Sequence, residues 1–229
     1  MLKNMSYNLH WQIHSLESIR YADALKKQQL LFEEMLQQKN NPDRNLVGHL
    51  LFCEHPPVFT LGKNGKTNHL LIDAQTLANE NIEYFPADRG GDITYHGYGQ
   101  LVLYPILDLD LLKIGLRQYV HTLEQAVIQT LQLLNLPAQR LEKAAGVWLN
   151  PNEKICALGI KASRNVTMHG LALNVYTSLK HFDYIVACGL EGKKTTSILE
   201  KTGKKYPLTI IADMLLLQLE QLLLNDLPQ

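Results

Sequence analysis

Segments of strand length and segments with helical spacing alternate along the whole chain, and this alternation limits the possible folds more than any single motif. Apolar runs predict strands at 46–53, 82–85, 92–96, 100–109, 146–150, 154–163 and 167–175. Apolar periodicity, capping residues and proline predict helices at 20–38, 73–81, 117–135, 178–185 and from Pro207 onward. In the first of these, the residues with helical spacing are Ala22, Leu25, Leu30 and Met35. The sequence shows no repeat and no change of composition. We therefore expect one α/β (α+β) domain over residues 1–229.

Composition excludes several classes of protein. The 22 basic and 22 acidic side chains cancel, which argues against a nucleic-acid binder. Charged residues interrupt the most apolar stretch, 208–227, and the N-terminus has no signal-peptide run, so we expect a cytoplasmic protein with no membrane partner. The three cysteines form no CxxC pair, and no HxxxH or HExxH spacing supports a metal site. We expect no metal and no disulfide framework.

The stretch RGGDITYHGYGQ, residues 89–100, is the most unusual segment of the sequence. It matches neither GxxxxGK[ST] nor a GxGxxG that opens a helix, which argues against a phosphate loop. Because it lies between two strand patterns, we interpret it as a hairpin whose N–H groups face a carbonyl or carboxylate. The alternative is a tight hairpin whose glycines serve geometry alone. His96 and His169 are, by themselves, better explained as satisfied histidines of the core or of turns than as catalysts.

Cys188 is the thiol with the most accessible position, because it lies in the glycine-bounded segment VACGLEG. Cys53 and Cys156 lie within apolar strand patterns, where cysteine behaves as a buried hydrophobe. A nucleophilic thiol needs a group that favours the thiolate. Lys154 opens a strand but is 188 − 154 = 34 residues away, so the pattern alone does not pair the two. At this level the sequence indicates a thiol enzyme with a glycine-lined pocket and an undefined substrate.

Several segments together resemble the lipoyl(octanoyl) transferases over nearly the whole chain. They are RYADALKKQQ, FCEHPPVFTLGKNG, RGGDITYHGYGQLVLYPILDL, KICALGIKASRNVTMHGLALNV, FDYIVACGL and the later TTSI. The combination of RGG-x-x-T-x-HG-x-GQ, a lysine strand, HG-x-ALN and a late CG is specific. The resemblance implies the fold of the biotin and lipoate ligases, a mixed sheet flanked by helices, in a single octanoyltransferase catalytic domain.

The resemblance also implies an activity and the residues that perform it. An octanoyl or lipoyl group would pass from octanoyl-acyl carrier protein to a lysine of the lipoyl domains of 2-oxoacid dehydrogenase E2 subunits or of the glycine cleavage H protein. Cys188 would form the acyl thioester and Lys154 would tune it, without a cofactor, in a monomer. The implied substrate pocket consists of Arg89, Gly90, Gly91, Asp92, Ile93, Thr94, Tyr95, His96, Ala157, Leu158, Gly159, Gly170, Leu171 and Ala172.

Two positions depart from the family pattern. Tyr98 stands where relatives usually have proline, so the turn must be held without a locked φ angle, and Lys161 stands where many have arginine. The alternative function is an ATP-dependent lipoate or biotin ligase, which has the same fold but needs no nucleophilic thiol. Five lysines against two glutamates between 188 and 205, a local excess of 5 − 2 = +3, suggest either a solvated loop or a surface for an acidic carrier protein.

Overall fold

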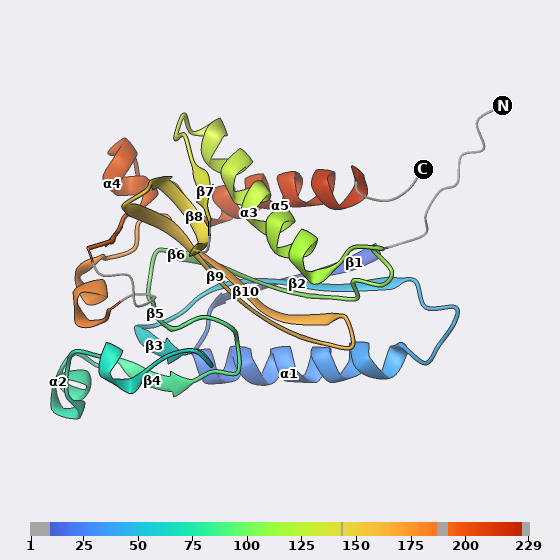
Figure 1. The fold of residues 1–229 in the computed structure, drawn as a ribbon, viewed down its shortest axis with the longest axis horizontal. Helices are drawn as coiled ribbons and strands as arrows, with labels where there is room; N and C mark the ends of the chain where they lie inside the picture. Colours follow the sequence, from blue (N-terminus) through green and yellow to red (C-terminus); the bar gives the residue numbers. More distant parts are fainter. Residues whose placement is uncertain (1–9, 143, 187–191, 226–229) are drawn as a thin grey trace.

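The computed structural model describes residues 10–142, 144–186 and 192–225. Its main element is an eight-stranded mixed sheet (Figure 1). The strands lie in the order β1 (His10–Ser18), β2 (Leu46–Glu54), β6 (Gln100–Leu107), β10 (Val166–Asn174), β9 (Glu153–Ser163), β8 (Ala144–Asn150) and β7 (Gln139–Leu141), with β11 (Lys194–Thr195) beside β9. Pairing is antiparallel except between β1 and β2 and between β11 and β9.

A second, smaller sheet lies beside one end of the main sheet. It has the order β4 (Glu83–Pro86), β3 (Val58–Leu61) and β5 (Ile93–His96), with β3 parallel to β4 and antiparallel to β5. The short helix α2 (Ala74–Asn79) and the 3₁₀ turn η1 (Thr67–His69) connect β3 to β4. The segment 88–92 leads from this sheet toward β9, and its placement there forms one wall of the site described below.

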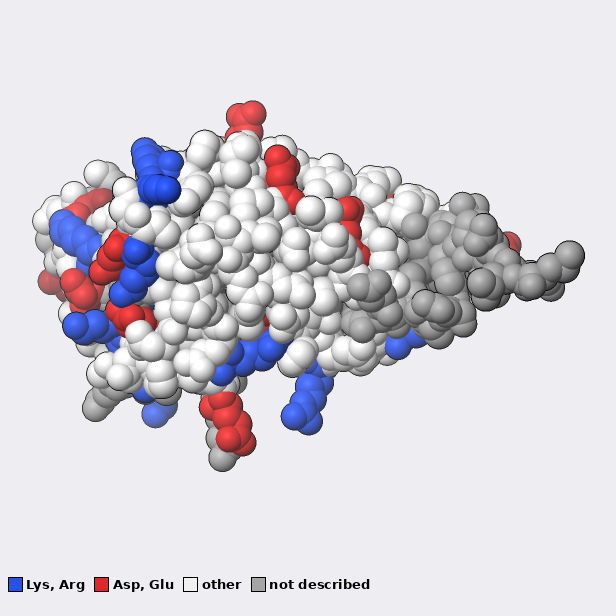
Figure 2. All heavy atoms as spheres, turned by 90° about the horizontal axis from the view of Figure 1, so that it is seen from above, with Lys and Arg blue, Asp and Glu red and all other residues white. Residues whose placement is uncertain are grey.

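Helices cover the two faces of the main sheet. In Figure 1, α1 (Tyr21–Gln38) lies below the sheet, and α3 (Leu116–Leu133) and α5 (Leu208–Asn225) lie above it. The buried apolar residues form one cluster between the sheet and α3 with α5, and another between the sheet and α1. Figure 2 shows the α3 and α5 side as a broad surface with few charged side chains. The fold class is the mixed α/β domain expected from the sequence.

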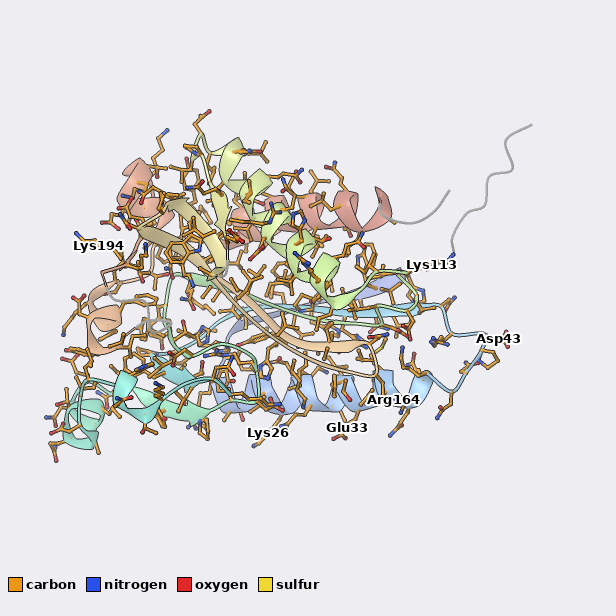
Figure 3. All side chains as sticks on the ribbon, in the orientation of Figure 1. Lys26, Glu33, Asp43, Lys113, Arg164 and Lys194 are labelled. Atoms are coloured by element: carbon orange, nitrogen blue, oxygen red, sulfur yellow. The ribbon has the colours of Figure 1, made fainter. Side chains whose placement is uncertain are left out.

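The predicted helix at 20–38 is confirmed, but the face that it buries differs from the predicted one. The stripe through Leu30 was wrong, since Leu30 is 61% exposed, and the buried positions include Ala24, Gln28, Leu31 and Met35. These follow the i, i+4, i+7, i+11 spacing of one helix face. Figure 3 shows Lys26 and Glu33 on the opposite side of α1, pointing away from the sheet.

Two further predictions from the sequence were wrong in detail. The strands at 92–96 and 100–109 form no hairpin, because β5 pairs with β3 while β6 pairs with β2 and β10. The helix expected at 178–185 is only the 3₁₀ turn η2 (Lys180–Tyr184), because Ile185 has extended backbone and bridges to Leu70. β1, β3, β7, β11 and the short helix α4 (Ile198–Thr202) were not predicted.

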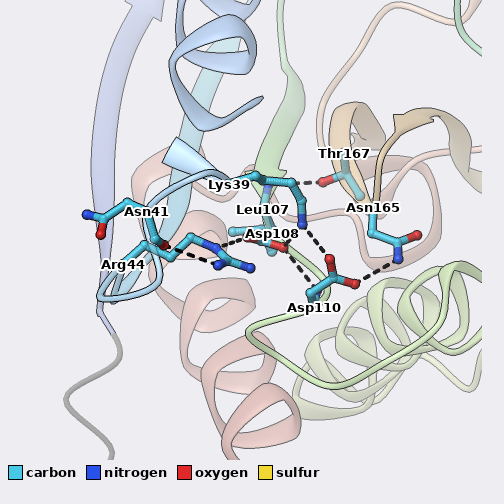
Figure 4. A network of polar contacts seen from close by, with 8 residues as sticks. All are labelled: Lys39, Asn41, Arg44, Leu107, Asp108, Asp110, Asn165 and Thr167. Atoms are coloured by element: carbon cyan, nitrogen blue, oxygen red, sulfur yellow. Dashed lines mark hydrogen bonds and ion pairs between the residues drawn. The ribbon is translucent and has the colours of Figure 1, made fainter. Parts of the chain in front are cut away.

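A buried ionic network holds one end of the main sheet (Figure 4). Asp108, directly after β6 and fully buried, accepts hydrogen bonds from Lys39 Nζ at 2.5 Å and from Arg44 Nε at 2.9 Å. Lys39 also pairs with Asp110 at 2.6 Å, and Asn165, from the β9–β10 connection, donates to Asp110 at 2.7 Å. The network therefore joins the segment after α1, the end of β6 and the β9–β10 turn.

Candidate acyl-transfer site

A narrow cavity lies on the α1 side of the main sheet, between β9 and β10 and the segment that includes β5. Its volume is about 40 Å³. It is lined by Tyr21, Arg89, Gly91, Asp92, Ile93, Thr94, His96, Tyr104, Ala157, Leu158, Gly159, His169, Gly170, Leu171 and Ala172. The structure thus brings all of the predicted pocket residues to one cavity except Gly90 and Tyr95. The Tyr95 hydroxyl instead lies 2.8 Å from His181 Nδ1.

The glycines beside Arg89 allow the segment 88–92 to lie close to strand β9 of the main sheet. Gly90 N donates to Ile160 O on β9 at 2.9 Å. A Cβ on Gly159 would lie 2.8 Å from Arg89 Cδ and 2.9 Å from Gly90 O, so this contact requires glycine. Gly91 has φ +82°, which also favours glycine. The group that comes so close to these glycines is therefore strand β9, and the cavity lies next to that contact.

A chain of buried hydrogen bonds begins at the Arg89 guanidinium and continues through neutral groups. Arg89 Nη2 donates to the Thr60 carbonyl at 2.7 Å and to the Thr60 hydroxyl at 2.8 Å. The Thr60 hydroxyl is 3.4 Å from His96 Nε2, and His96 Nδ1 is 2.7 Å from Gln100 Oε1. Because the Gln100 amide nitrogen donates elsewhere, its oxygen needs a donor, which assigns the proton of His96 to Nδ1. Burial lowers the pKa of His96 to about 3, so its imidazole is neutral and acts as no proton shuttle at neutral pH.

The same chain continues to the backbone of Lys154. Gln100 Nε2 donates to Asn174 Oδ1 at 2.9 Å, and Asn174 Nδ2 donates to Thr196 O at 3.0 Å. Thr196 N then donates to Lys154 O at 2.9 Å. Gln100, Asn174 and Thr196 are all buried. Satisfied buried networks fix one arrangement of the groups they connect, so the cavity wall and the Lys154 strand are held in register with each other.

Lys154 lines a second, smaller cavity next to the first. This cavity of about 20 Å³ shares Thr94, Ala157 and Ala172 with the larger one, so the two are adjacent. Lys154 Nζ donates to Ala145 O at 3.0 Å and lies 4.8 Å from the centre of the Trp148 ring. The sequence reasoning placed Lys154 at the site, and the structure places it at the end of the paired cavities.

Cys188, the predicted nucleophile, lies outside the described residues. On one side of it Val186 N donates to His69 O, and on the other side β11 places Thr195 opposite Lys154. The other two thiols are buried as predicted, Cys53 next to His55 and Cys156 in the core of β9. Burial raises the pKa of both thiols well above the ordinary value, so neither is a thiolate at neutral pH.

Sequence reasoning did not identify three residues of the cavity lining. Tyr21 begins α1, Tyr104 lies in the middle of β6, and His169 was interpreted as a satisfied histidine. His169 is indeed buried and bonds through Nε2 to Asp88 Oδ1 at 2.7 Å, with φ +62°. Tyr21 and Tyr104 lie in two of the segments that carry the family resemblance, but only the packing of α1 against β6 and β5 shows that they reach the cavity.

Asp88 is held by two basic partners at the edge of this cavity. Its carboxylate accepts hydrogen bonds from His169 and, at 2.6 Å, from Lys161 Nζ. Burial would raise the pKa of Asp88, but the hydrogen bonds from Lys161 and His169 outweigh it and lower the pKa to about 2. The carboxylate is therefore charged at neutral pH and keeps His169 in a fixed orientation.

The turn that has Tyr98 in place of proline is held by other bonds. Gly99 N donates to the Glu54 carboxylate at 2.8 Å, and Gly99 O accepts from Val175 N and Tyr176 N. The Tyr98 side chain is 54% exposed and does not line either cavity.

Two features are absent from the residues that the structure describes. In this part of the chain no group of three or more His, Cys, Asp or Glu side chains is arranged to hold a metal ion. No helix within the same residues is long and apolar enough to span a membrane.

Comparison with known proteins identifies the family of the chain. Residues 20–220 match the model of the lipoyl protein ligase A/B catalytic domain. The chain is 46% identical to an octanoyltransferase of Parabacteroides distasonis over 84% of this chain and 89% of that protein. It is 43% identical to an octanoyltransferase of Cytophaga hutchinsonii over 92% of this chain and 91% of that protein.

Solved structures share the fold at low sequence identity. A bipartite lipoate protein ligase from Thermoplasma acidophilum is 15% identical, with a TM-score of 0.71 over 94% of this chain and 84% of that one. A biotin protein ligase from Aquifex aeolicus is 16% identical, with a TM-score of 0.54 over 95% of this chain and 71% of that one. These structures support the predicted ligase-like fold alone.

The chain belongs to the lipoyl protein ligase A/B catalytic-domain family. Within that family it is an acyltransferase, as the resemblance of the sequence implied.

Proposed function

We propose that this enzyme takes an octanoyl group from acyl carrier protein, holds it as a thioester on Cys188, and delivers it to a lysine of a lipoyl domain. Octanoyl transfer in protein lipoylation is the activity of this chain, as its octanoyltransferase relatives support, and lipoyl domains are its acceptors. The carrier-protein donor, the cysteine intermediate and the E2 and H-protein acceptors are the parts that we propose. The observation that carries them is the pair of adjacent cavities that joins the predicted acyl pocket to Lys154.

The proposed chemistry needs no energy source beyond the donor thioester. The Cys188 thiolate attacks the octanoyl carbonyl, a new C–S bond forms, and the old C–S bond breaks to release the carrier thiol, which takes up one proton. The acceptor amine then attacks the enzyme thioester, forms an amide, and loses a proton as Cys188 leaves. Thioester exchange is close to neutral in energy, and amide formation drives the second half.

Lys154 has two proposed roles in these steps. Its ammonium would lower the pKa of a nearby thiol by favouring the thiolate. As a neutral amine it would accept the proton of the attacking lysine. The neutral chain from His96 through Gln100 and Asn174 to Thr196 supports both roles, because it fixes the backbone of Lys154 relative to the acyl cavity.

A mass measurement tests the intermediate. Incubation with octanoyl-acyl carrier protein should add one octanoyl group to the intact enzyme, in a form that hydroxylamine removes. Cys188→Ala should abolish the adduct, while Cys53→Ala should keep it because Cys53 is buried. An adduct that survives in Cys188→Ala contradicts the assignment. A strict requirement for ATP and free octanoate would instead support the ligase alternative.

Variants of Lys154 separate its two roles. Arginine keeps the charge but stays protonated, so Lys154→Arg should partly retain acylation of Cys188 and lose much more of the transfer to the acceptor. Lys154→Ala should impair both half-reactions and shift the pH profile of thiol alkylation upward. Single-turnover acylation and deacylation, with alkylation rate against pH, measure these effects. An unchanged alkylation profile in Lys154→Ala refutes the electrostatic role.

The lysine-rich segment is our proposed surface for the acidic carrier protein. Its lysines differ in how far they are already engaged by other groups of this chain. Lys193 and Lys201 are engaged locally, with Pro151 O and Asn152 and with Glu153, whereas Lys194 is exposed and points outward in Figure 3. Lys194→Glu should therefore raise the KM for the carrier protein and weaken the salt dependence of transfer. Lys26→Glu, on the far side of α1, is the matched control, and equal effects of the two would remove this surface.

A further inference from the structure

The inner side of the larger cavity is made of polar rings. Tyr21, His96, Tyr104 and His169 are all buried, whereas residues 157–159 of β9, on the outer side, are half-buried. An acyl chain that enters past β9 therefore meets four rings with hydrogen-bonding atoms. A saturated hydrocarbon chain has no atom that can form a hydrogen bond with these rings. Whether each ring already has a partner within the protein therefore decides which acyl chains the cavity prefers to bind.

Three of these rings have hydrogen-bond partners within the protein, and the fourth has none among the described residues. The satisfied rings bond as follows: His96 to Thr60 and Gln100, Tyr104 to His55 at 2.8 Å, and His169 to Asp88. The Tyr21 hydroxyl is buried and makes no hydrogen bond in the part of the chain that the structure describes. A buried hydroxyl without a partner costs free energy, and a ligand atom or a water in the cavity removes that cost.

The Tyr21 ring is fixed in this position. It stacks on His96 with 6.2 Å between ring centres and 10° between planes, and it packs with Val58 and Ala87. It also contacts the edge of His55. Burial raises the pKa of Tyr21 to about 12, so the hydroxyl keeps its proton and remains a donor. The protein therefore presents one oriented and unused donor to the cavity.

Tyr21 lies toward the end of the acyl chain that is distant from the reacting carbonyl. Lys154 lines only the smaller cavity, Tyr21 lines only the larger one, and the two cavities meet at Thr94, Ala157 and Ala172. With the reacting carbonyl at Lys154, as the proposed function requires, the far half of a medium-length chain lies toward Tyr21. Plain octanoyl has no polar atom in that half.

We propose that the Tyr21 hydroxyl raises the transfer of medium-chain acyl groups that carry a sulfur or oxygen acceptor on the far half of the chain, relative to the transfer of plain octanoyl. Lipoyl carries such acceptors, and octanoyl carries none. The inference rests on the proposed acyl transfer, which supplies the orientation of the chain. Tyr21 is thus a specificity-determining residue, and its effect is a ratio between donors rather than an overall rate.

The test compares donors in wild type and Tyr21→Phe. Octanoyl-, lipoyl- and 8-hydroxyoctanoyl-acyl carrier protein are each assayed for kcat/KM with a lipoyl domain as acceptor. The ratio of 8-hydroxyoctanoyl to octanoyl should fall about fivefold in Tyr21→Phe, as expected for one lost hydrogen bond, and the lipoyl ratio should fall in the same direction. Tyr119→Phe removes another buried hydroxyl that lies outside both cavities, and its ratios should match wild type. Equal ratios in wild type and Tyr21→Phe overturn the proposal.

Thermal unfolding without donor gives an independent measurement. Removal of an unsatisfied hydroxyl should leave the Tm of Tyr21→Phe equal to or above that of wild type. A clear drop in Tm means that the hydroxyl already has a partner in the folded protein, and this result also overturns the proposal. Wild type that transfers no acyl group from any donor refutes the proposed function itself, whereas transfer with unchanged ratios refutes only the role of Tyr21.

Discussion

The two ends of strand β6 meet two buried polar networks of opposite kinds. Asp108, directly after the strand, is a carboxylate that contacts Lys39 and Arg44. Gln100, at the start of the strand, belongs to a chain of neutral groups that includes His96 and Asn174. The first network joins the ends of three chain segments, and the second links the cavity wall to the Lys154 strand.

The difference shows that a charged and a neutral buried network contribute differently within one sheet, the first mainly to stability and the second mainly to orientation. We call the Asp108 end of β6 the far end, because it contacts neither cavity, and the Gln100 end the near end. Removing one partner of a buried ion pair leaves an uncompensated charge, so the network at the far end contributes strongly to stability. The neutral chain has directional donors and acceptors, each used once, and so it sets orientation. We infer that the network at the far end stabilises the fold, and that the network at the near end sets the geometry of the site.

The largest expected effect is at the far end. Asp108→Asn removes the negative charge between Lys39 and Arg44, whose side chains are 7% and 19% exposed. The free energy of unfolding should fall by about 3 kcal/mol. Octanoyl transfer per folded molecule should stay within about twofold of wild type, since Asp108 lines neither cavity. Urea denaturation and single-turnover assays measure both, and Lys26→Ala, an exposed-pair control, should change stability by less than about 0.5 kcal/mol.

The next effect is at the near end and should change activity as well. Gln100→Leu leaves His96 Nδ1 and Asn174 Oδ1 buried without their partners, so the free energy of unfolding should fall by about 2 kcal/mol. Transfer per folded molecule should fall at least about tenfold, because Lys154 loses its fixed relation to the cavity. If Asp108→Asn and Gln100→Leu reduce stability and activity in the same proportion, the two networks do not differ in role.

The pH dependence of stability should also differ between the two ends of β6. Burial lowers the pKa of His55 to about 4 and that of His96 to about 3, so both are neutral when folded but take up protons near pH 6.5 when unfolded. Stability should therefore be complete above pH 6.5 and fall toward pH 4, by about 1.4 kcal/mol per pH unit for each imidazole. His55→Gln should reduce the slope measured by urea denaturation between pH 7 and 4.5. An unchanged slope would show that His55 is not a source of it.

The far end should respond only at lower pH. The hydrogen bond from Lys39, and after it that from Asn165, lowers the pKa of Asp110 below its ordinary value. A carboxyl with a lowered pKa contributes its stability above the unfolded pKa and loses it as the pH falls through the folded pKa. In Asp110→Asn the loss of stability below about pH 4 should be smaller than in wild type, while the slope between pH 6.5 and 4.5 should be unchanged. A changed slope in the higher range would contradict the division between the ends.

The smallest expected effect concerns Lys161, at the edge of the larger cavity. Lys161 pairs with Asp88 at 2.6 Å, but the Asp88 side chain is 44% exposed. Lys161→Arg should therefore change stability by less than about 0.5 kcal/mol, because partly solvated pairs contribute little. Thermal unfolding compares it with Lys161→Met, which removes the charge. A loss above about 1 kcal/mol in Lys161→Arg would place Asp88 among the stability-determining carboxylates with Asp108.

Much of the site was predictable from the sequence because its motifs are continuous. The pattern RGG-x-x-T-x-HG-x-GQ contains Arg89 and His96, and the strand KICALGI contains Lys154, so these residues were identified with their surroundings. Tyr21 was not identified, although it lies in the segment RYADALKKQQ, because a helical pattern does not show which side chains reach the cavity. The face of that helix was also misjudged at Leu30, because the number of apolar residues did not show which stripe faces the sheet.

The sequence by itself determined the alternation of strands and helices, the family, and the residue types that acyl transfer needs. These depend on local periodicity, on turn residues and on chemical groups, all of which are read along the chain. Only the tertiary structure decided that β5 and β6 separate into two sheets, that Gln100 and Asn174 meet, and that Tyr21 lines the larger cavity with a hydroxyl that has no partner among the described residues. The physical reason is that pairing and burial join residues far apart in sequence, and no local pattern records which of many possible partners a strand or a polar side chain will take.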